Sequence, residues 1–132
     1  MPPEPLGLKV ICCGIEDDLH ELPVHLAALI LDSDGWEVVN LGPNTPLFSL
    51  PEMLMHTRPQ LLCVSGKMLS DPDRTAIEYA QLRKTTDKFG IPIVLGGDAF
   101  KNEAMRARFP ANFYAEDFAG LVEFARALKL QG

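Results

Sequence analysis

"LKVICCGIEDDLHELP", residues 8 to 23, joins an apolar run to an acidic loop that contains one histidine and ends at a proline. The run from Leu8 to Cys13 lacks polar alternation, which is typical of a strand covered on both faces in a parallel sheet. The loop places Glu16, Asp17, Asp18 and His20 directly after that strand. Open α/β sheets bind ligands beyond the carboxyl ends of their strands, so this loop is predicted to border a ligand site.

Similar apolar runs recur along the chain, and helical segments separate them. Strands are predicted at Leu8 to Cys13, Trp36 to Leu41, Leu61 to Ser65, Ile91 to Leu95 and, as an edge strand, at "NFYA", residues 112–115. Helices are predicted over Pro23 to Asp34, Leu47 to Thr57, 71–89, 101–109 and Glu116 to Leu130. This alternation predicts an α/β fold: a three-layer, doubly wound, five-stranded parallel sheet of flavodoxin-like strand order, with Leu61 to Ser65 beside the first strand.

Local signals predict where some of these elements begin and end, and which face of the last helix is buried. The turn "GPNTP", residues 42–46, is predicted to separate the second strand from the second helix. The stretch "SDPDR", residues 70–74, combines a capping Ser or Asp with Pro in the first turn, and Gly90 is expected to end that helix. In the last helix an amphipathic pattern predicts an inward face made of Phe118, Leu121, Val122, Phe124, Ala125 and Leu128.

Length and charge limit the functions available to the chain. With 132 residues and 47% hydrophobic residues, we expect a single domain over residues 1–132, with residues 1–6 flexible. A net charge of -6 without a Lys/Arg cluster argues against direct binding of nucleic acid or of an anionic membrane. No apolar run approaches the roughly 18 residues of a spanning helix, and no secretory signal is visible, so we expect a cytoplasmic protein.

The cysteines do not suggest a disulfide framework or a zinc site. Cys12, Cys13 and Cys63 all lie in predicted strands, and their odd number and spacing match neither pattern. They are therefore expected to be reduced thiols in the core.

Three chemistries common on this architecture do not match the loops that follow the strands. A flavin mononucleotide site needs a loop whose amides hold a phosphate, and the carboxylates after the first strand would repel one. A phosphoacceptor receiver needs an Asp at the end of the third strand and a Lys after the fifth, where this chain has "VSGK" and "YAED". A dinucleotide site would need G-x-G-x-x-G after the first strand, and only Gly14 is present.

A different pattern does match. Asp18-Leu19-His20 follows the first strand, Ser65 ends the third, and Gly96-Gly97 ends the fourth. In this order the chain resembles the cobalamin (vitamin B12)-binding domain, whose signature is D-x-H-x-x-G, then S-x-L, then G-G. The resemblance covers essentially the whole chain, and Pro23 stands where the signature has its glycine. "LGPNTPLFSL", residues 41–50, looks most like the cobalamin-binding domains of MerR-type light-sensing transcriptional regulators.

The resemblance implies a cofactor and a site. His20 would be the lower axial ligand to cobalt in adenosylcobalamin or methylcobalamin, displacing the cofactor's own base. The nucleotide tail would then lie beside Ser65, Gly66, Gly96 and Gly97, in a sensory or regulatory domain. A helical cap, a protein partner or a second copy would cover the upper face of the corrin.

The chemistry of these residues agrees with that assignment. A neutral imidazole is a good ligand for cobalt, and Asp18 can accept a hydrogen bond from the other ring nitrogen of His20. Gly96 and Gly97 lack a Cβ, so a bulky ligand is expected to lie against the backbone there. Ser65 offers a hydroxyl to the base of the tail, whereas His25 and His56 are expected at the surface.

Two other functional classes remain open at this stage. The chain has the length and expected fold of small cobalamin-carrier subunits of mutases or corrinoid methyltransferases, which bring the cofactor to a catalytic subunit. It also fits a relative that binds haem, or no cofactor, and acts as an interaction domain. The sequence shows no acid/base constellation of its own, so we expect a cofactor-binding module rather than an enzyme.

Overall fold

The computed structural model describes residues 7–16 and 21–131. In this part of the chain five parallel strands form one sheet in the order β2-β1-β3-β4-β5, which confirms the predicted flavodoxin-like fold. The strands are β1 (Lys9–Ile15), β2 (Glu37–Thr45), β3 (Leu61–Ser65), β4 (Ile93–Gly96) and β5 (Phe113–Ala115). The helices are α1 (Glu21–Ser33), α2 (Leu50–Thr57), α3 (Pro72–Phe89), α4 (Glu103–Arg108) and α5 (Phe118–Gln131), with short 3-10 turns at Leu47–Ser49 and Asp98–Phe100. The expectation for residues 1–6 lies outside the described residues.

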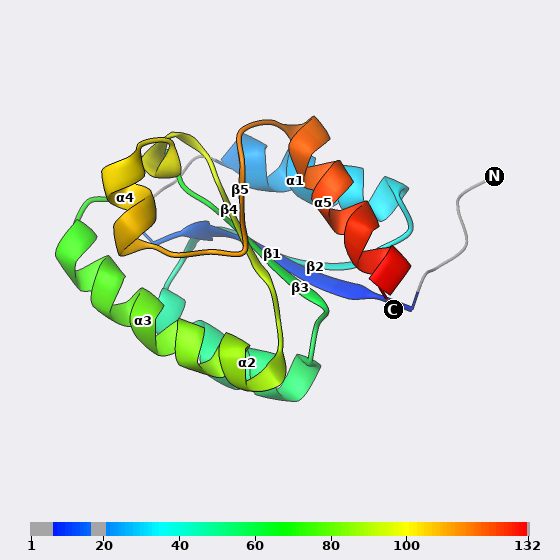
Figure 1. Cartoon of the computed structure of the whole chain (residues 1–132), viewed down its shortest axis with the longest axis horizontal. Coiled ribbons are helices and arrows are strands. Elements are labelled where there is room, and N and C mark those ends of the chain that lie inside the picture. The colour runs from blue at the N-terminus through cyan, green and yellow to red at the C-terminus, as the bar shows by residue number, and fades with distance from the viewer. Residues whose placement is uncertain (1–6, 17–20, 132) are drawn as a thin grey trace.

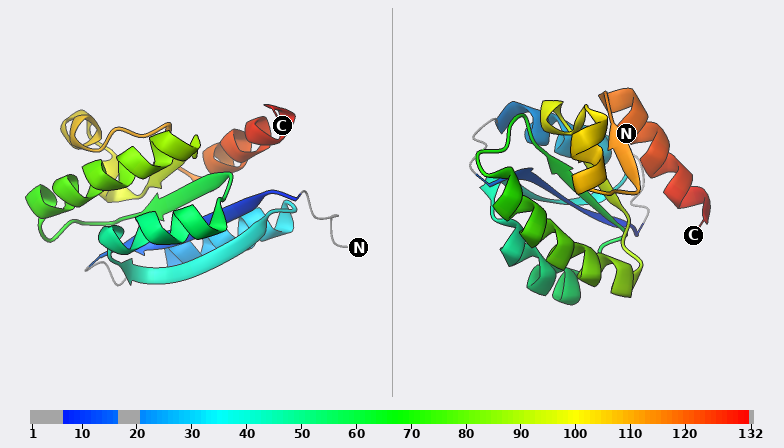
Figure 2. Two further views of the ribbon diagram at one scale, coloured as in Figure 1. Left: turned by 90° about the horizontal axis from the view of Figure 1, so that it is seen from below. Right: turned by 60° about the vertical axis from the view of Figure 1, so that its left-hand side comes forward.

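Helices cover both faces of the sheet (Figure 1). Helices α2 and α3 pack on one face and α1 and α5 on the other, which the two views of Figure 2 also show. Side chains of β1 alternate between these layers, because Ile11 and Cys13 join the core under α2 and α3 while Val10 and Cys12 join the core under α1 and α5. Both faces of the central strands are thus apolar, as the unbroken hydrophobic runs predicted.

Strand β2 is longer than the sequence predicted. The segment 42–45, predicted as part of a turn, continues the strand and pairs with β1 as far as Thr45 opposite Ile15. Two shifts of register interrupt this pairing, at Cys12/Cys13 and at Cys13/Ile15. Gly42 and Asn44 adopt positive φ angles of 77° and 56°, so the turn-forming residues appear as irregularities inside a strand rather than as its end.

Helix α3 has the predicted ends. The Asp71 side chain accepts a hydrogen bond from the Arg74 backbone N–H at 3.1 Å, and Pro72 occupies the first turn. Gly90 ends the helix with φ 66°, a conformation that suits glycine.

The inward face predicted for α5 is correct except at its first residue. Leu121 and Ala125 are buried, and Val122, Phe124 and Leu128 are partly buried. Phe118 is 38% exposed. The reason is its position at the very start of α5, beside a cavity rather than over the sheet.

No helix in the described part of the chain combines the length and apolar character needed to cross a membrane.

Candidate functional site

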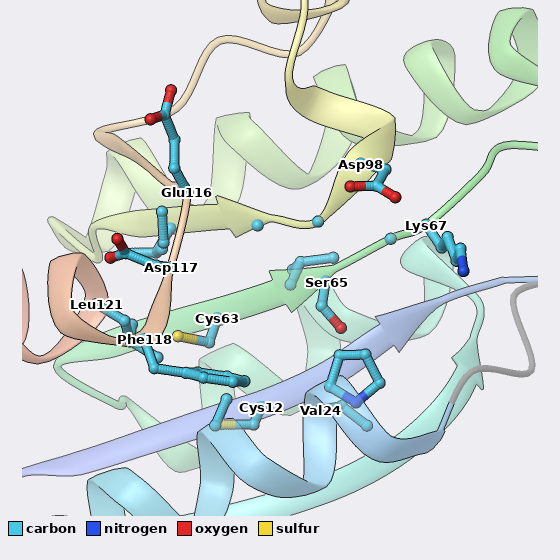
Figure 3. A pocket seen from close by; sticks show the side chains of 18 of the residues that line it. Cys12, Val24, Cys63, Ser65, Lys67, Asp98, Glu116, Asp117, Phe118 and Leu121 are labelled. Carbon is cyan, nitrogen blue, oxygen red and sulfur yellow. The ribbon is translucent and has the colours of Figure 1, made fainter.

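A cavity of about 330 Å³ opens at the carboxyl ends of β1, β3, β4 and β5, between α1 and the start of α5 (Figure 3). This is the end of the sheet at which open α/β folds bind ligands. Six apolar side chains form what we call the inner wall: Cys12, Val24, Ala27, Cys63, Val94 and Leu121. Six polar side chains form what we call the mouth: Ser65, Lys67, Asp98, Lys101, Glu116 and Asp117.

The structure brings together four of the six residues that the sequence predicted for cofactor binding. Ser65, Gly66, Gly96 and Gly97 all line this one cavity, although about 30 residues of sequence separate the two pairs. Asp18 and His20 lie outside the described residues. Pro23, which stands in the glycine position of the resembled signature, also lines the cavity.

Gly97 has a structural reason to be glycine. Its φ angle is 96°, and a Cβ built on it would lie 2.2 Å from the Gly66 carbonyl oxygen. The two loops approach closely here, because the Gly66 N–H donates to the Gly96 carbonyl at 3.0 Å and the Gly66 carbonyl accepts from the Ala99 N–H at 3.0 Å. The sequence predicted that a bulky ligand would lie against the backbone of Gly96 and Gly97. At Gly97 the space that a Cβ would occupy is filled by Gly66, while Gly97 itself still lines the cavity.

Gly66 is also closely surrounded by protein, whereas a Cβ on Gly96 would make only ordinary contacts. A Cβ on Gly96 would lie 3.4 Å from the Ala115 carbonyl oxygen of β5. A Cβ on Gly66 would lie 3.1 Å from Ile15 and 3.3 Å from Phe100. Gly66 and Gly97 therefore let the loops after β3 and β4 pack tightly, and the cavity lies beside them.

The three cysteines are free and buried, as predicted. Cys12 and Cys63 are register partners on β1 and β3, and both belong to the inner wall. A hydrogen bond with Cys12, together with burial, raises the pKa of the Cys63 thiol well above its usual value. Burial raises the pKa of Cys13 to about 12. Both thiols are thus held protonated and behave as small, weakly polar core residues.

The mouth carries charges of both signs. Lys101 and Asp98 form an ion pair at 2.8 Å. The pKa of the Asp98 carboxyl is lowered, first by the hydrogen bond from Lys101 and further by its charge and that of Lys67. Glu116 and Asp117 stand on the other side of the opening, and Asp117 accepts the Gly120 N–H at 2.7 Å, which fixes the start of α5.

Several lining residues were not identified as site residues from the sequence. Cys12 and Cys63 were assigned to the core, and Phe118 to the inward face of a helix. The alignment of β1 with β3 is the signal that would have placed both thiols on one face at the same level. Among residues 7–16 and 23–130, no three His, Cys, Asp or Glu side chains gather as a metal site, and His25 and His56 are exposed as expected.

No family model matches the chain. It is 27% identical to methionine synthase from Mycobacterium leprae over 120 residues, which cover 89% of this chain and 9% of the relative. It is 25% identical to trimethylamine corrinoid protein 1 from Methanosarcina acetivorans over 121 residues, 92% of this chain and 56% of the relative. The chain thus spans about half or less of the length of these relatives. Neither of the two is a MerR-type regulator.

Solved structures share the fold. The methanol:cobalamin methyltransferase complex from Methanosarcina barkeri superposes with a TM-score of 0.77 at 23% identity, covering 98% of this chain and 49% of that one. A cobalamin-binding protein from Desulfitobacterium hafniense gives a TM-score of 0.74 at 18% identity, covering 92% of this chain and 58% of that one. The fold of this chain is therefore the one adopted by cobalamin-binding proteins.

Proposed function

We propose that this chain binds cobalamin and carries it to a partner protein, as a corrinoid carrier module of a methyl-transfer system. One observation carries the proposal: Ser65, Gly66, Gly96 and Gly97, chosen from the sequence as tail-binding residues, line a single cavity. Similarity to a corrinoid protein over 92% of the chain supports the same cofactor.

The cavity fits one part of this cofactor. Its volume of about 330 Å³ lies at the lower end of the roughly 300–1,000 Å³ of ligand pockets, so it suits one arm of a large ligand. The apolar inner wall matches the flat base of the nucleotide tail, and Ser65 offers a hydroxyl beside it. The corrin ring would remain outside, over the carboxyl ends of the strands. Bound there, the cofactor would supply a cobalt-carbon bond that can transfer its organic group.

We propose His20 as the lower ligand to cobalt, with Asp18 accepting the hydrogen bond from its other ring nitrogen. The loop that contains both residues leads from β1 into α1, whose Pro23, Val24 and Ala27 line the cavity. Pro23 is compatible with this position, since it lies in the first turn of α1, where a backbone N–H has no partner within the helix.

The carrier role is favoured over the sensory role by the proteins that the chain resembles. One solved relative is a methyltransferase complex, and a carrier needs a partner to perform the chemistry. The sensory role rests on the resemblance of residues 41–50 to MerR-type regulators. Under either role we propose a single cytoplasmic domain that does not itself contact nucleic acid, in keeping with its charge of -6 and its buried free thiols.

A binding experiment tests the proposal. The purified chain is incubated in the dark with methylcobalamin, adenosylcobalamin or haem, desalted, and examined by absorption spectroscopy. We expect retained cobalamin with the spectrum of a cofactor whose own base has left the cobalt. Loss of all corrinoid on desalting would contradict the proposal, and retention of haem alone would favour the haem-binding alternative. Light-dependent self-association of the loaded protein would favour the sensory role over the carrier role.

A further inference from the structure

The inner wall has almost no hydrogen-bonding capacity. Its six side chains are buried and offer only carbon and sulfur. The residues belong to β1, β3, β4, α1 and α5, where backbone groups are largely paired within the sheet or the helix. The two thiols, Cys12 and Cys63, interact with each other, and a thiol is a weak donor in any case. A polar ligand group buried against this wall would therefore lose its hydrogen bonds to water and gain none from the protein.

Phe118 adds an aromatic surface to the same cavity. Asp117 fixes the first turn of α5, which places Phe118 at the cavity edge. Figure 3 shows its ring pointing into the cavity, toward the side formed by Cys12 and Cys63. The residue Phe118 is 38% exposed, so a flat ligand packed against its ring would bury apolar surface that the protein alone leaves in contact with water.

We propose that this cavity selects corrinoids by their lower base, taking a benzimidazole-type base in preference to an adenine-type base, and that Phe118 supplies the surface on which the base packs. The inference rests on the proposed function. A benzimidazole linked to its sugar has one free ring nitrogen, which the Ser65 hydroxyl at the mouth can reach, and carbon elsewhere. Adenine adds further ring nitrogens and an amino group, which would face the inner wall unpaired.

The size of the preference follows from the cost of burying an unpaired polar group. One such group weakens binding by about 5- to 150-fold. Packing of a base on an aromatic side chain contributes a factor of similar size, so removing the Phe118 ring should weaken binding of any corrinoid that carries a base. The affinity for a corrinoid without a nucleotide should not depend on the Phe118 ring.

Three corrinoids separate these effects: cobalamin, its analogue with adenine as lower base, and cobinamide, which lacks the nucleotide. Each is titrated into the wild-type chain, Phe118→Ala, Cys63→Ser and the control Ile77→Ala, which removes an exposed apolar side chain from α3 on the other face of the sheet. We expect wild type to prefer cobalamin over the adenine analogue by at least about fivefold. Phe118→Ala should weaken both about tenfold and leave cobinamide unchanged. Cys63→Ser adds a hydroxyl to the inner wall that can pair with the polar groups of adenine. It should therefore reduce the preference for cobalamin over the adenine analogue.

Equal affinity of wild type for cobalamin and the adenine analogue would overturn the inference and leave the proposed function standing. So would an affinity for cobinamide as high as for cobalamin, or equal weakening of all three corrinoids by Phe118→Ala. Failure of wild type to bind any corrinoid would overturn both. Circular dichroism checks that each variant folds. If Cys63→Ser does not fold, the Phe118→Ala variant, which changes an exposed residue, still tests the inference.

Discussion

At the scale of single residues, Gly97 shows how closely the cavity is tied to the fold. It combines a left-handed backbone with a contact to Gly66 that leaves no room for a side chain. The loops after β3 and β4 meet through this contact, and both line the cavity. The glycine that resembles a cofactor motif is thus also required by backbone packing.

Replacing Gly97 by Ala should therefore destabilise the protein through two effects. The added Cβ would meet the Gly66 carbonyl oxygen at 2.2 Å, and an L-residue at φ 96° is strained. We expect a loss of about 2 kcal/mol or more in the free energy of unfolding, measured by urea denaturation. Gly42→Ala is the matched control, since φ is 77° there but no atom beyond the two adjoining residues lies within 4 Å of the Cβ. It should lose only about 1–2 kcal/mol, and a control that loses as much as Gly97→Ala would refute the steric explanation.

His20 carries the second prediction at this scale. His20→Ala should abolish the absorption signature of a cobalt-histidine bond, because the metal would lose its lower ligand. Binding to wild type should weaken as the pH falls below the ordinary imidazole pKa of about 6.5, since only the neutral ring coordinates cobalt. Asp18→Ala should weaken binding more mildly, by about 10- to 100-fold.

His25→Ala and His56→Ala are the controls for these variants, because both side chains are exposed and neither lines the cavity. They should bind cobalamin normally. If wild type takes up cobalamin and His20→Ala gives the same spectrum and affinity, the axial-ligand hypothesis is wrong.

At the scale of elements, helix α3 illustrates how local sequence fixes an end. Asp71 caps the Arg74 N–H, and Gly90 ends this helix of 18 residues. Tyr79 and Leu82 of this helix fill the core against β1 and β3, and the Tyr79 hydroxyl donates to the Pro110 carbonyl at 2.7 Å. The loop that follows Ser65 and Gly66 ends at the start of α3.

Removing this cap by Asp71→Ala should lower the free energy of unfolding by about 1 kcal/mol, because one N–H of the first turn loses its acceptor. Gln81→Ala, at an exposed position in the middle of the same helix, should stay within about 0.5 kcal/mol of wild type. Chemical denaturation of both variants measures the difference. Indistinguishable stabilities would mean that the hydrogen bond of Asp71 adds nothing to the helix.

At the scale of the whole molecule, α1 and α5 form one layer, and ion pairs connect α5 to the end of α1 that lies away from the cavity. Arg126 of α5 approaches the Asp34 carboxylate at 3.0 Å, and Lys129 approaches it at 3.1 Å. Asp34 follows α1 and its side chain is 16% exposed. The cavity lies at the opposite end of this layer, between Val24 and Leu121, so the link keeps together the two helices that enclose the cavity.

This link predicts a pH dependence of stability. The Arg126 hydrogen bond, assisted by Lys129, lowers the pKa of Asp34 below its ordinary value of 3.8. The stabilisation is therefore fully present above that value and is lost as the pH falls through the lower pKa of the folded state. Asp34→Asn should be less stable than wild type at pH 7, and the difference should vanish in acid. Thermal unfolding between pH 7 and pH 2 measures it, and a difference independent of pH would contradict the ionic origin.

Local sequence patterns were enough to predict the helices and strands and their order along the chain. Apolar runs without alternation mark strands covered on both faces, and caps such as Asp71 and Gly90 act within a few residues, so both can be recognised locally. Ser65, Gly66, Gly96 and Gly97 were identified because their motifs resemble those of cobalamin-binding domains, and parallel strands bring these strand ends to one edge of the sheet.

Features that depend on residues far away in the chain could not be predicted from local patterns. Strand β2 continues to Thr45 because β1 is there to pair with it, and the local turn residues signalled an end instead. Cys12 and Cys63 become neighbours only through the register of β1 and β3, and Phe118 becomes part of the cavity only because α5 starts beside it. Gly97 must be glycine because Gly66, more than 30 positions earlier, occupies the place of its side chain. Steric contacts of this kind are fixed by packing in three dimensions, and no local pattern encodes them.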